Sequence, residues 1–335
     1  METKLEITHE LEKLAEEDKL DSKIAILNLP TANYCEKRAE RVLNEQGELE
    51  QSCLGCIHNE LKSTSRLSKD RIEEVIDYFA KNHGTKFITI NGRGDPFFPT
   101  LKPETVHKVQ YAYQNYNIQS YIFTAGDNLD EQTCRILAES DANITISLFG
   151  NKFIDADFFA GKEYASAEKP LQNQANIAEN LRRLISTYRA SPNQPKEGTT
   201  RLGMNYVVSE SDLQDDGRKV SALKQVANEN GLFFVCNTPF EKNSDSAIQQ
   251  RLETLAHQHS DFNLQHSTAV KGQCQMGAGS SATVDYDGTM LRCPYMDNKD
   301  GNGKFQELSQ EEREQILEKY VQDRAYLCVM RKHQK

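Results

Sequence analysis

Short apolar segments alternate with amphipathic segments along most of the chain, and this alternation restricts the possible folds more than any other feature. The apolar segments have the length of buried strands, and the amphipathic segments repeat their apolar residues at helical spacing. Strands that are apolar throughout and separated by helices are typical of a parallel sheet. The predicted strands are IAILNLP (24–30), FITING (87–92), SYIFTAG (120–126), NITISLFG (143–150), RLGMNYVVS (201–209) and LFFVCNTPF (232–240). The predicted helices between them span 70–82, 103–117, 130–140, 175–188 and 220–230.

Strand–helix units in this number predict an α/β fold, in which right-handed crossovers curl the sheet into a partial (βα)6 TIM-like barrel. A helical arm with Leu5, Leu11 and Leu14 near helical spacing precedes the barrel. After the barrel the pattern changes to short strands, a loop rich in Gly, Asn and Asp, and a final helix. In folds of this kind, ligands bind at the carboxyl ends of the strands. The expected divisions are an N-terminal helical arm at 1–22, the partial barrel at 23–242 and a small C-terminal domain at 243–335.

The composition excludes several classes of function. The chain has 335 residues and a formal net charge of −10, whereas nucleic-acid-binding proteins usually carry a basic face, so we expect no nucleic-acid partner. Residues 1–21 contain no apolar signal region, and no window approaches about 18 apolar residues, so we expect no membrane partner and a cytoplasmic protein. In that reducing compartment the eight cysteines favour metal or redox use over disulfides.

One set of cysteines follows the first predicted strand. Cys53 and Cys56 form a CxxC, a spacing that lets two thiolates bind one metal or one edge of a cluster, and Cys35 lies upstream beside the strand end. A zinc site with His58 as a further ligand and a redox CxxC are both compatible with these residues. Three thiolates also suit a [4Fe–4S] cluster with one iron open to an external ligand.

A glycine-rich turn follows the second predicted strand, with the sequence Gly92-Arg93-Gly94-Asp95 before a proline. Its glycines let the backbone approach a ligand closely, and Asp95 adds a carboxylate beside it. The alternative is an ordinary turn in which Asp95 caps the next helix.

The order of these features resembles the radical S-adenosylmethionine (SAM) superfamily over residues 23–240. The resemblance implies that Cys35, Cys53 and Cys56 hold the [4Fe–4S] cluster that binds SAM, although their spacing is C-x17-C-x2-C where the family has C-x3-C-x2-C. The intervening segment 36–52 is charged, and we expect it to form a helical excursion.

The same resemblance assigns the SAM-binding residues. The turn Gly92, Arg93, Gly94 and Asp95 takes the place of a Gly-Gly-Glu-like motif that binds the amino group of SAM, with Asp replacing Glu. Polar residues on the later strands match positions that face SAM in the family; these are Thr124, Ser147 and Asn205.

A second set of cysteines lies near the C-terminus: Cys274, Cys293 and Cys328. The segment VDYDGTMLRC before and including Cys293 predicts a hairpin with an Asp-Gly turn. This arrangement resembles the C-terminal SPASM and twitch modules, which implies one auxiliary [4Fe–4S] cluster. Its fourth ligand is left open between Cys236, a non-cysteine side chain and the substrate, and the alternative is a plain hairpin with incidental cysteines.

We expect different locations and roles for the remaining cysteines and for three histidines. Cys236 ends the sixth predicted strand, and we expect it to point toward the barrel mouth as a catalytic hydrogen-atom donor or an iron ligand; the alternative is a small buried apolar residue. Cys134 lies on the apolar face of a predicted helix and is expected in the core. The histidines of one polar stretch are expected at the surface; they are His257, His259 and His266.

Together these features predict a radical SAM enzyme. The resemblance implies reductive cleavage of SAM to a 5′-deoxyadenosyl radical, which abstracts hydrogen from a substrate in a net oxidation or rearrangement, with electrons from a flavodoxin- or ferredoxin-type donor. Only about 20 residues precede the barrel, too few for a winged-helix peptide-binding domain, so a small-molecule substrate is favoured over a ribosomal peptide or protein. The alternative from another class is a zinc-stabilised α/β binding protein without redox activity.

Overall fold

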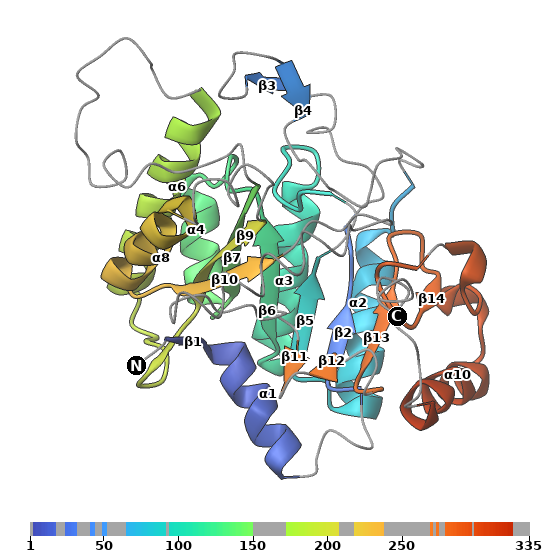
Figure 1. Cartoon of the computed structure of the whole chain (residues 1–335). Helices are drawn as coiled ribbons and strands as arrows, with labels where there is room; N and C mark the ends of the chain where they lie inside the picture. Colours follow the sequence, from blue (N-terminus) through green and yellow to red (C-terminus); the bar gives the residue numbers. More distant parts are fainter. Residues whose placement is uncertain are drawn as a thin grey trace, which may run out of the picture.

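One open sheet of eight strands organises the molecule (Figure 1). The computed structural model describes residues 3–17, 24–31, 41–43, 49–51, 65–91, 94–149, 172–207, 218–237, 269–270, 273–274, 279–296 and 298–323. The strand order is β10-β9-β7-β6-β5-β2-β13-β14. The strands are β2 (Ile26–Asn28), β5 (Phe87–Ile90), β6 (Gln119–Thr124), β7 (Asn143–Phe149), β9 (Leu202–Val207), β10 (Phe233–Asn237), β13 (Ser281–Val284) and β14 (Met290–Leu291).

All neighbouring strands of this sheet are parallel except β13 and β14, which form an antiparallel hairpin. The six predicted strands are therefore confirmed, and they lie side by side in chain order. β10 and β14 are the two ends of the sheet, so the described strands form an open sheet and not a closed barrel. This is the α/β fold with a partial, parallel barrel that the sequence predicts.

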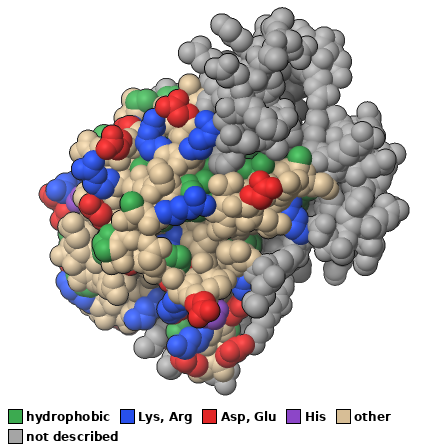
Figure 2. All heavy atoms as spheres, turned by 90° about the vertical axis from the view of Figure 1, so that its left-hand side faces the viewer, with side chains coloured by type: hydrophobic (Ala, Val, Ile, Leu, Met, Phe, Trp, Pro, Cys, Tyr) green, Lys and Arg blue, Asp and Glu red, His purple; other side chains and the backbone are tan. Residues whose placement is uncertain are grey.

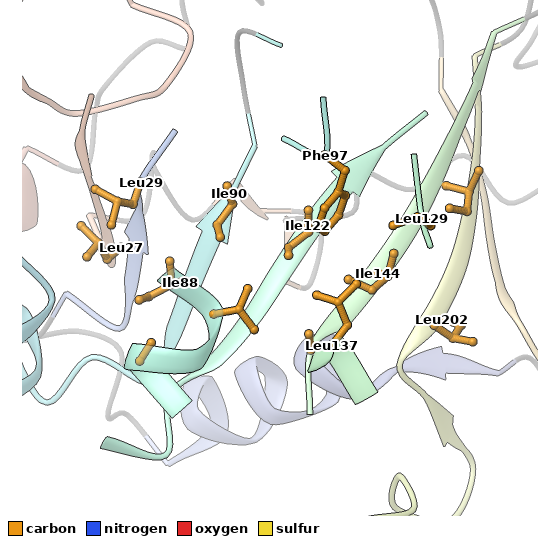
Figure 3. Packing of buried hydrophobic residues seen from close by; sticks show 14 of the residues in the cluster. Leu27, Leu29, Ile88, Ile90, Phe97, Ile122, Leu129, Leu137, Ile144 and Leu202 are labelled. Carbon is orange, nitrogen blue, oxygen red and sulfur yellow. The ribbon is translucent and has the colours of Figure 1, made fainter. Parts of the chain in front are cut away.

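Helices cover the convex face of the sheet and bury one large apolar cluster. Alternate strand residues such as Ile88, Ile122 and Ile144 point to this face, and Figure 3 shows them on one side of the ribbon. Strand residues alternate between faces, so this cluster takes every second side chain. The covering helices are α2 (Lys69–Tyr78), α3 (Lys102–Tyr116), α4 (Glu131–Glu139), α6 (Gln172–Ala190), α8 (Arg218–Asn230) and α10 (Gln310–Gln322).

The predicted N-terminal arm is helix α1 (Glu6–Glu16), and it packs on the opposite, concave face. Ile7 and Leu11 of α1 share an apolar cluster with Ile26, Phe87 and Phe233, which start three of the strands. Helix α1 therefore closes the amino-terminal end of the partial barrel, at the lower end of the sheet in Figure 1.

A buried ion pair fixes α1 in this place. The Arg201 guanidinium, just before β9, donates to the carboxylate of Glu6 in the first turn of α1 and to Asp141 Oδ1 at 2.7 Å. The backbone N–H of Ile7 also donates to Asn143 Oδ1 at 3.3 Å. The short strand β1 (Lys4–Leu5) adds a parallel pairing with β8 (Thr199–Thr200).

The segment between the first two cysteines of the sequence contains a hairpin where we expected a helix. Strand β3 (Arg41–Leu43) pairs antiparallel with β4 (Leu49–Gln51), and Figure 1 shows this hairpin beyond the carboxyl ends of the sheet. The helix prediction is wrong for these residues because charge-rich composition is a weak local preference, which strand pairing overrides.

The C-terminal hairpin joins the main sheet. The sequence predicts a hairpin around 280–293, and β13 and β14 with Gly288 at φ +89° in the turn confirm it. However, β13 pairs in parallel with β2, with Ala282 opposite Leu27, so the sheet of the barrel continues into the region predicted as a separate domain. Helix α10 then packs beside α2, where Tyr78 Oη donates to Glu314 Oε1 at 2.5 Å. A second short hairpin consists of β11 (Ala269–Val270) and β12 (Gln273–Cys274).

The described surface carries both signs of charge. Figure 2 shows Lys and Arg interspersed with Asp and Glu on one face, without a continuous basic area among the coloured residues in view. In the ranges that the structure describes, no helix is both long enough and apolar enough to cross a membrane.

Candidate functional site

The candidate site lies at the carboxyl ends of the parallel strands, where the loops after β2, β5 and β6 meet. Asp95, in the loop after β5, is the best-defined of the predicted residues there. Its side chain is buried, with 7% of the residue exposed, and it accepts the N–H of Phe97 at 2.9 Å in a tight local turn. Helix α3 begins later, at Lys102, so Asp95 does not cap it, and the alternative interpretation of this residue is wrong.

The carboxylate of Asp95 also binds the end of the neighbouring strand β6. Thr124 Oγ1 donates to it at 3.0 and 3.1 Å, and the N–H of Ala125 donates to Oδ2 at 2.7 Å. The Thr124 hydroxyl in turn accepts the N–H of Gly126 at 3.1 Å. The structure therefore brings together Asp95 and Thr124, two residues that the sequence assigns to SAM binding, and connects them directly.

Ser147 and Asn205 form a second polar pair on the concave face. They lie opposite each other on β7 and β9, near the carboxyl ends, and Asn205 Nδ2 donates to Ser147 Oγ at 3.0 Å. The hydroxyl hydrogen of Ser147 is not used in this bond. The pairing shows that these two predicted residues are neighbours and face the same side of the sheet.

A buried lysine that was not predicted as a site residue supports the loop after β2. Lys108 of α3 is fully buried, and its Nζ donates to the carbonyls of Leu29 at 3.2 Å and Pro30 at 3.1 Å. Glu104 Oε1, one helical turn earlier, lies 2.8 Å from the same ammonium. Burial lowers the pKa of Lys108, and the adjacent Glu104 carboxylate opposes that shift. A lysine on the apolar face of α3, between Thr105 and Ala112, was the available signal.

Cys236 does not point where we expected. Strand alternation places Val235 in the concave cluster with α1, and Cys236 in the large cluster under the helices, 2% exposed. The thiol therefore lies on the helix-covered face of β10 and not at the barrel mouth. Cys134 is buried in the same cluster, as predicted, and burial raises the pKa of its thiol to about 11.

Most of the predicted metal ligands fall outside the described residues. These are Cys35, Cys53, Cys56 and Cys328, and the turn residues Gly92 and Arg93 and the histidines at 257, 259 and 266 lie outside as well. Of the second set, Cys274 is in strand β12 and Cys293 is buried two residues after the end of β14. Within the described residues, no group of three or more His, Cys, Asp or Glu side chains is arranged to hold a metal ion. The two cysteine sets therefore stay predictions.

An open parallel sheet with polar groups at its carboxyl edge is the fold that the resemblance implies, and solved structures confirm the resemblance at the level of the fold alone. The chain is similar to the structure of anSMEcpe with bound AdoMet, which is SAM, and the Cp18Cys peptide. The TM-score is 0.53 at 14% identity, covering 90% of this chain and 83% of that chain. It is also similar to Streptococcus suis SuiB bound to precursor peptide SuiA, with TM-score 0.53 and 14% identity over 93% of this chain and 68% of that chain. No family model matches the sequence, and no curated protein matches it.

The described residues fit the amino group of SAM. A carboxylate has about four lone-pair sites, and the Asp95 carboxylate accepts from Phe97 N, Ala125 N and the Thr124 hydroxyl. The donors among the described residues therefore leave one acceptor site on Asp95, which suits an ammonium group. The three cysteines that follow β2 in the sequence supply the thiolates that an iron–sulfur cluster requires.

Proposed function

We propose that the protein is a radical SAM enzyme. The observation that carries this proposal is the buried link from Asp95 to Thr124 and Ala125, at the carboxyl edge of an open parallel sheet. A [4Fe–4S] cluster held by Cys35, Cys53 and Cys56 would supply the electron that cleaves SAM to methionine and a 5′-deoxyadenosyl radical. The radical would then take a hydrogen atom from the substrate and leave as 5′-deoxyadenosine.

The residues of this chain would bind and enclose SAM. The turn of Gly92, Arg93, Gly94 and Asp95 would receive its amino group, with Asp95 as acceptor. Ser147 and Asn205 would face SAM from β7 and β9, where their amide–hydroxyl pair already lies on the concave face. Helix α1 seals the amino-terminal end of the sheet with apolar side chains, so it would keep water out of the site from that side.

A second cluster and an external electron donor complete the proposal. Cys274, Cys293 and Cys328 would hold an auxiliary [4Fe–4S] cluster, and a flavodoxin- or ferredoxin-type protein would deliver the electron. The tight attachment of the C-terminal hairpin to β2 supports this arrangement because it fixes the backbone before Cys293 against the barrel. The thiol of Cys236 has no part in it, since it lies on the face of β10 away from the mouth.

The substrate has two candidates. We propose a small molecule, as the sequence indicates, in a net oxidation or rearrangement. A peptide or protein is the second candidate, and one observation favours it: two structures with a similar fold, anSMEcpe and SuiB, contain a bound peptide.

Metal analysis followed by a cleavage assay tests the function. Anaerobically purified protein should be brown and contain about eight iron and eight sulfide per chain, since each cluster contains about four of each. With SAM and a strong reductant it should form 5′-deoxyadenosine. Colourless protein that contains only zinc, or the absence of 5′-deoxyadenosine, would contradict the proposal and favour the zinc-stabilised binding protein.

A pair of cysteine variants tests the unusual motif. Cys35→Ala should remove about half of the iron and abolish SAM cleavage. Cys134→Ala is the matched control because this thiol is buried in the apolar cluster under the helices and belongs to neither predicted cysteine set, so the variant should keep its full iron content. An intact SAM-binding cluster in Cys35→Ala would show that Cys35 is not a ligand.

A further inference from the structure

A chain of hydrogen bonds connects the loop after β2 with the loop after β5 through helix α3. Thr105 Oγ1 donates to the carbonyl of Pro96 at 2.6 Å, and it lies 3.2 Å from Thr31 Oγ1. Lys108 Nζ lies 3.4 Å from the same Thr31 oxygen. Thr31, Thr105 and Lys108 are all buried, so water does not compete for these bonds.

The directions of the donors are fixed by the single hydrogen of each hydroxyl. The Thr105 hydrogen is directed at the Pro96 carbonyl, so the Thr31 hydroxyl must donate to Thr105 Oγ1. Lys108 has three hydrogens, and its three nearest acceptors are Glu104 Oε1 at 2.8 Å and the carbonyls of Pro30 and Leu29 at 3.1 and 3.2 Å. Thr31 Oγ1, at 3.4 Å, is a fourth acceptor that can only share one of these hydrogens. The hydroxyl bonds therefore run in one direction, from Thr31 through Thr105 to the Pro96 carbonyl.

The two ends of this chain of bonds lie beside residues of the proposed site. Thr31 is four positions before Cys35 along the sequence, and Pro96 directly follows Asp95. Lys108 also holds the carbonyls of Leu29 and Pro30, at the point where the chain leaves β2. One turn of α3 is thus bonded to both loops.

We propose that Thr31, Thr105 and the Pro96 carbonyl form a positioning relay. Together with the Lys108 bonds to the Leu29 and Pro30 carbonyls, this relay holds the loop after β2, which leads to Cys35, and the SAM-binding loop in one relative position. This inference rests on the proposed function. SAM must bind the open iron and the Asp95 loop at the same time, so an error in the distance between the loops weakens its binding even when each loop is intact. Thr105 and Lys108 are positioning residues because they act through the loops and not on SAM directly.

Three variants separate positioning from simple stabilisation. Thr105→Val keeps the shape of the side chain and removes the hydroxyl, whereas Thr105→Ser keeps the hydroxyl. Thr85→Val is the matched control because Thr85 is also buried and donates one hydrogen bond to a carbonyl, that of Ile24 at 2.7 Å. Thr85 lies just before β5, at the opposite edge of the sheet.

The readouts are iron content, the dissociation constant for SAM by anaerobic equilibrium dialysis, and the change that SAM causes in the electron paramagnetic resonance spectrum of the reduced protein. Thr105→Val should keep its iron, bind SAM about ten-fold more weakly and show a smaller spectral change. Loss of a supporting hydrogen bond around a metal site commonly lowers affinity by about this factor. Thr105→Ser should remain within about two-fold of the wild type, and Thr85→Val should bind SAM as the wild type does.

Two outcomes overturn the relay. Either Thr105→Val binds SAM as tightly as the wild type, or Thr85→Val weakens binding as much as Thr105→Val does. If Thr105→Val does not fold, Thr31→Val interrupts the same relay at its other hydroxyl and is judged by the same readouts. If the wild-type protein assembles no cluster and binds no SAM, the proposed function itself is refuted. If the wild type binds SAM and Thr105→Val binds it equally well, only the relay is refuted.

Discussion

At the scale of single residues, Asp95 is the polar group on which the site most depends. Its carboxylate accepts the N–H groups of Phe97 and Ala125, and an amide cannot accept both in the same geometry because its nitrogen would face a donor. We therefore expect Asp95→Asn to lower the free energy of unfolding by about 1–3 kcal/mol, the cost of one unsatisfied buried donor, and to weaken SAM binding.

Denaturant unfolding and SAM dialysis measure both effects of Asp95→Asn. Asp130→Asn is a suitable control because Asp130 also accepts a backbone N–H, that of Thr133 at 2.8 Å, but at the start of α4. The control should lose stability without a change in the dissociation constant for SAM. Unchanged stability and binding in Asp95→Asn would show that the link to β6 has no energetic role.

Residue identities at the site were partly predictable. Asp95, Thr124, Ser147 and Asn205 were predicted from positions that the radical SAM resemblance assigns to SAM. The structure shows that Asp95 contacts Thr124 and that Ser147 contacts Asn205, and their role toward SAM stays a prediction. The direction of Cys236 was wrong because a shift by one residue along a strand moves a side chain to the other face. Lys108 was missed because its place on the apolar face of α3 was the one sequence signal, and only the structure shows that the side chain is buried.

At the scale of elements, helix α1 depends on a buried ion pair as well as on apolar contacts. Glu6 and Arg201 are both almost fully buried, so loss of the Glu6 charge leaves the guanidinium with Asp141 as its remaining carboxylate. We expect Glu6→Gln to lower the free energy of unfolding by about 1.5–3 kcal/mol, the range for hydrogen bonds to charged groups. Chemical denaturation measures this loss.

The surface pair of Lys4 and Glu12 provides the comparison, since its lysine is 55% exposed. Glu12→Gln should cost about 0–1 kcal/mol because water screens exposed pairs. Equal losses in Glu6→Gln and Glu12→Gln would mean that the buried pair does not hold α1 in place.

Elements with a strong periodic pattern were predicted well, and elements defined by distant partners were not. The six strands and the helices between them follow from apolar runs and helical spacing within each segment. The hairpin of β3 and β4 has no such pattern, and its charged composition favoured a helix. The place of β13 beside β2 depends on a pairing between distant segments, which local sequence does not encode.

At the scale of the whole molecule, the C-terminal segment and the barrel form one sheet, and a pair of glycines tests whether they unfold together. A Cβ at Gly279 would lie 2.5 Å from the Tyr320 carbonyl oxygen and 2.8 Å from Val321 Cα, so backbone would have to move. Gly198 has nearly the same backbone conformation, φ +77° against +78°, with open space around its Cα. The difference between the two alanine variants therefore isolates the close packing of α10 against the start of β13.

We expect Gly198→Ala to cost about 1–2 kcal/mol from its backbone conformation alone, and Gly279→Ala to cost about 1–3 kcal/mol more. Thermal unfolding of Gly279→Ala should remain a single transition at a lower midpoint, because β13 belongs to the barrel sheet. A second transition that stays at the wild-type midpoint would instead favour an independent domain at 243–335.

The pairing of β13 with β2 also determines when the sheet can be completed during synthesis. Asn28 and the Ala282 carbonyl that it binds are 254 positions apart, so β2 leaves the ribosome long before its partner on that side is made. Through this interval the nascent sheet ends at β2, whose free side is an unpaired edge of the kind that recruits other chains. Translation speed and chaperone binding over the last part of the chain should therefore have a large effect on how much of this protein reaches its folded state.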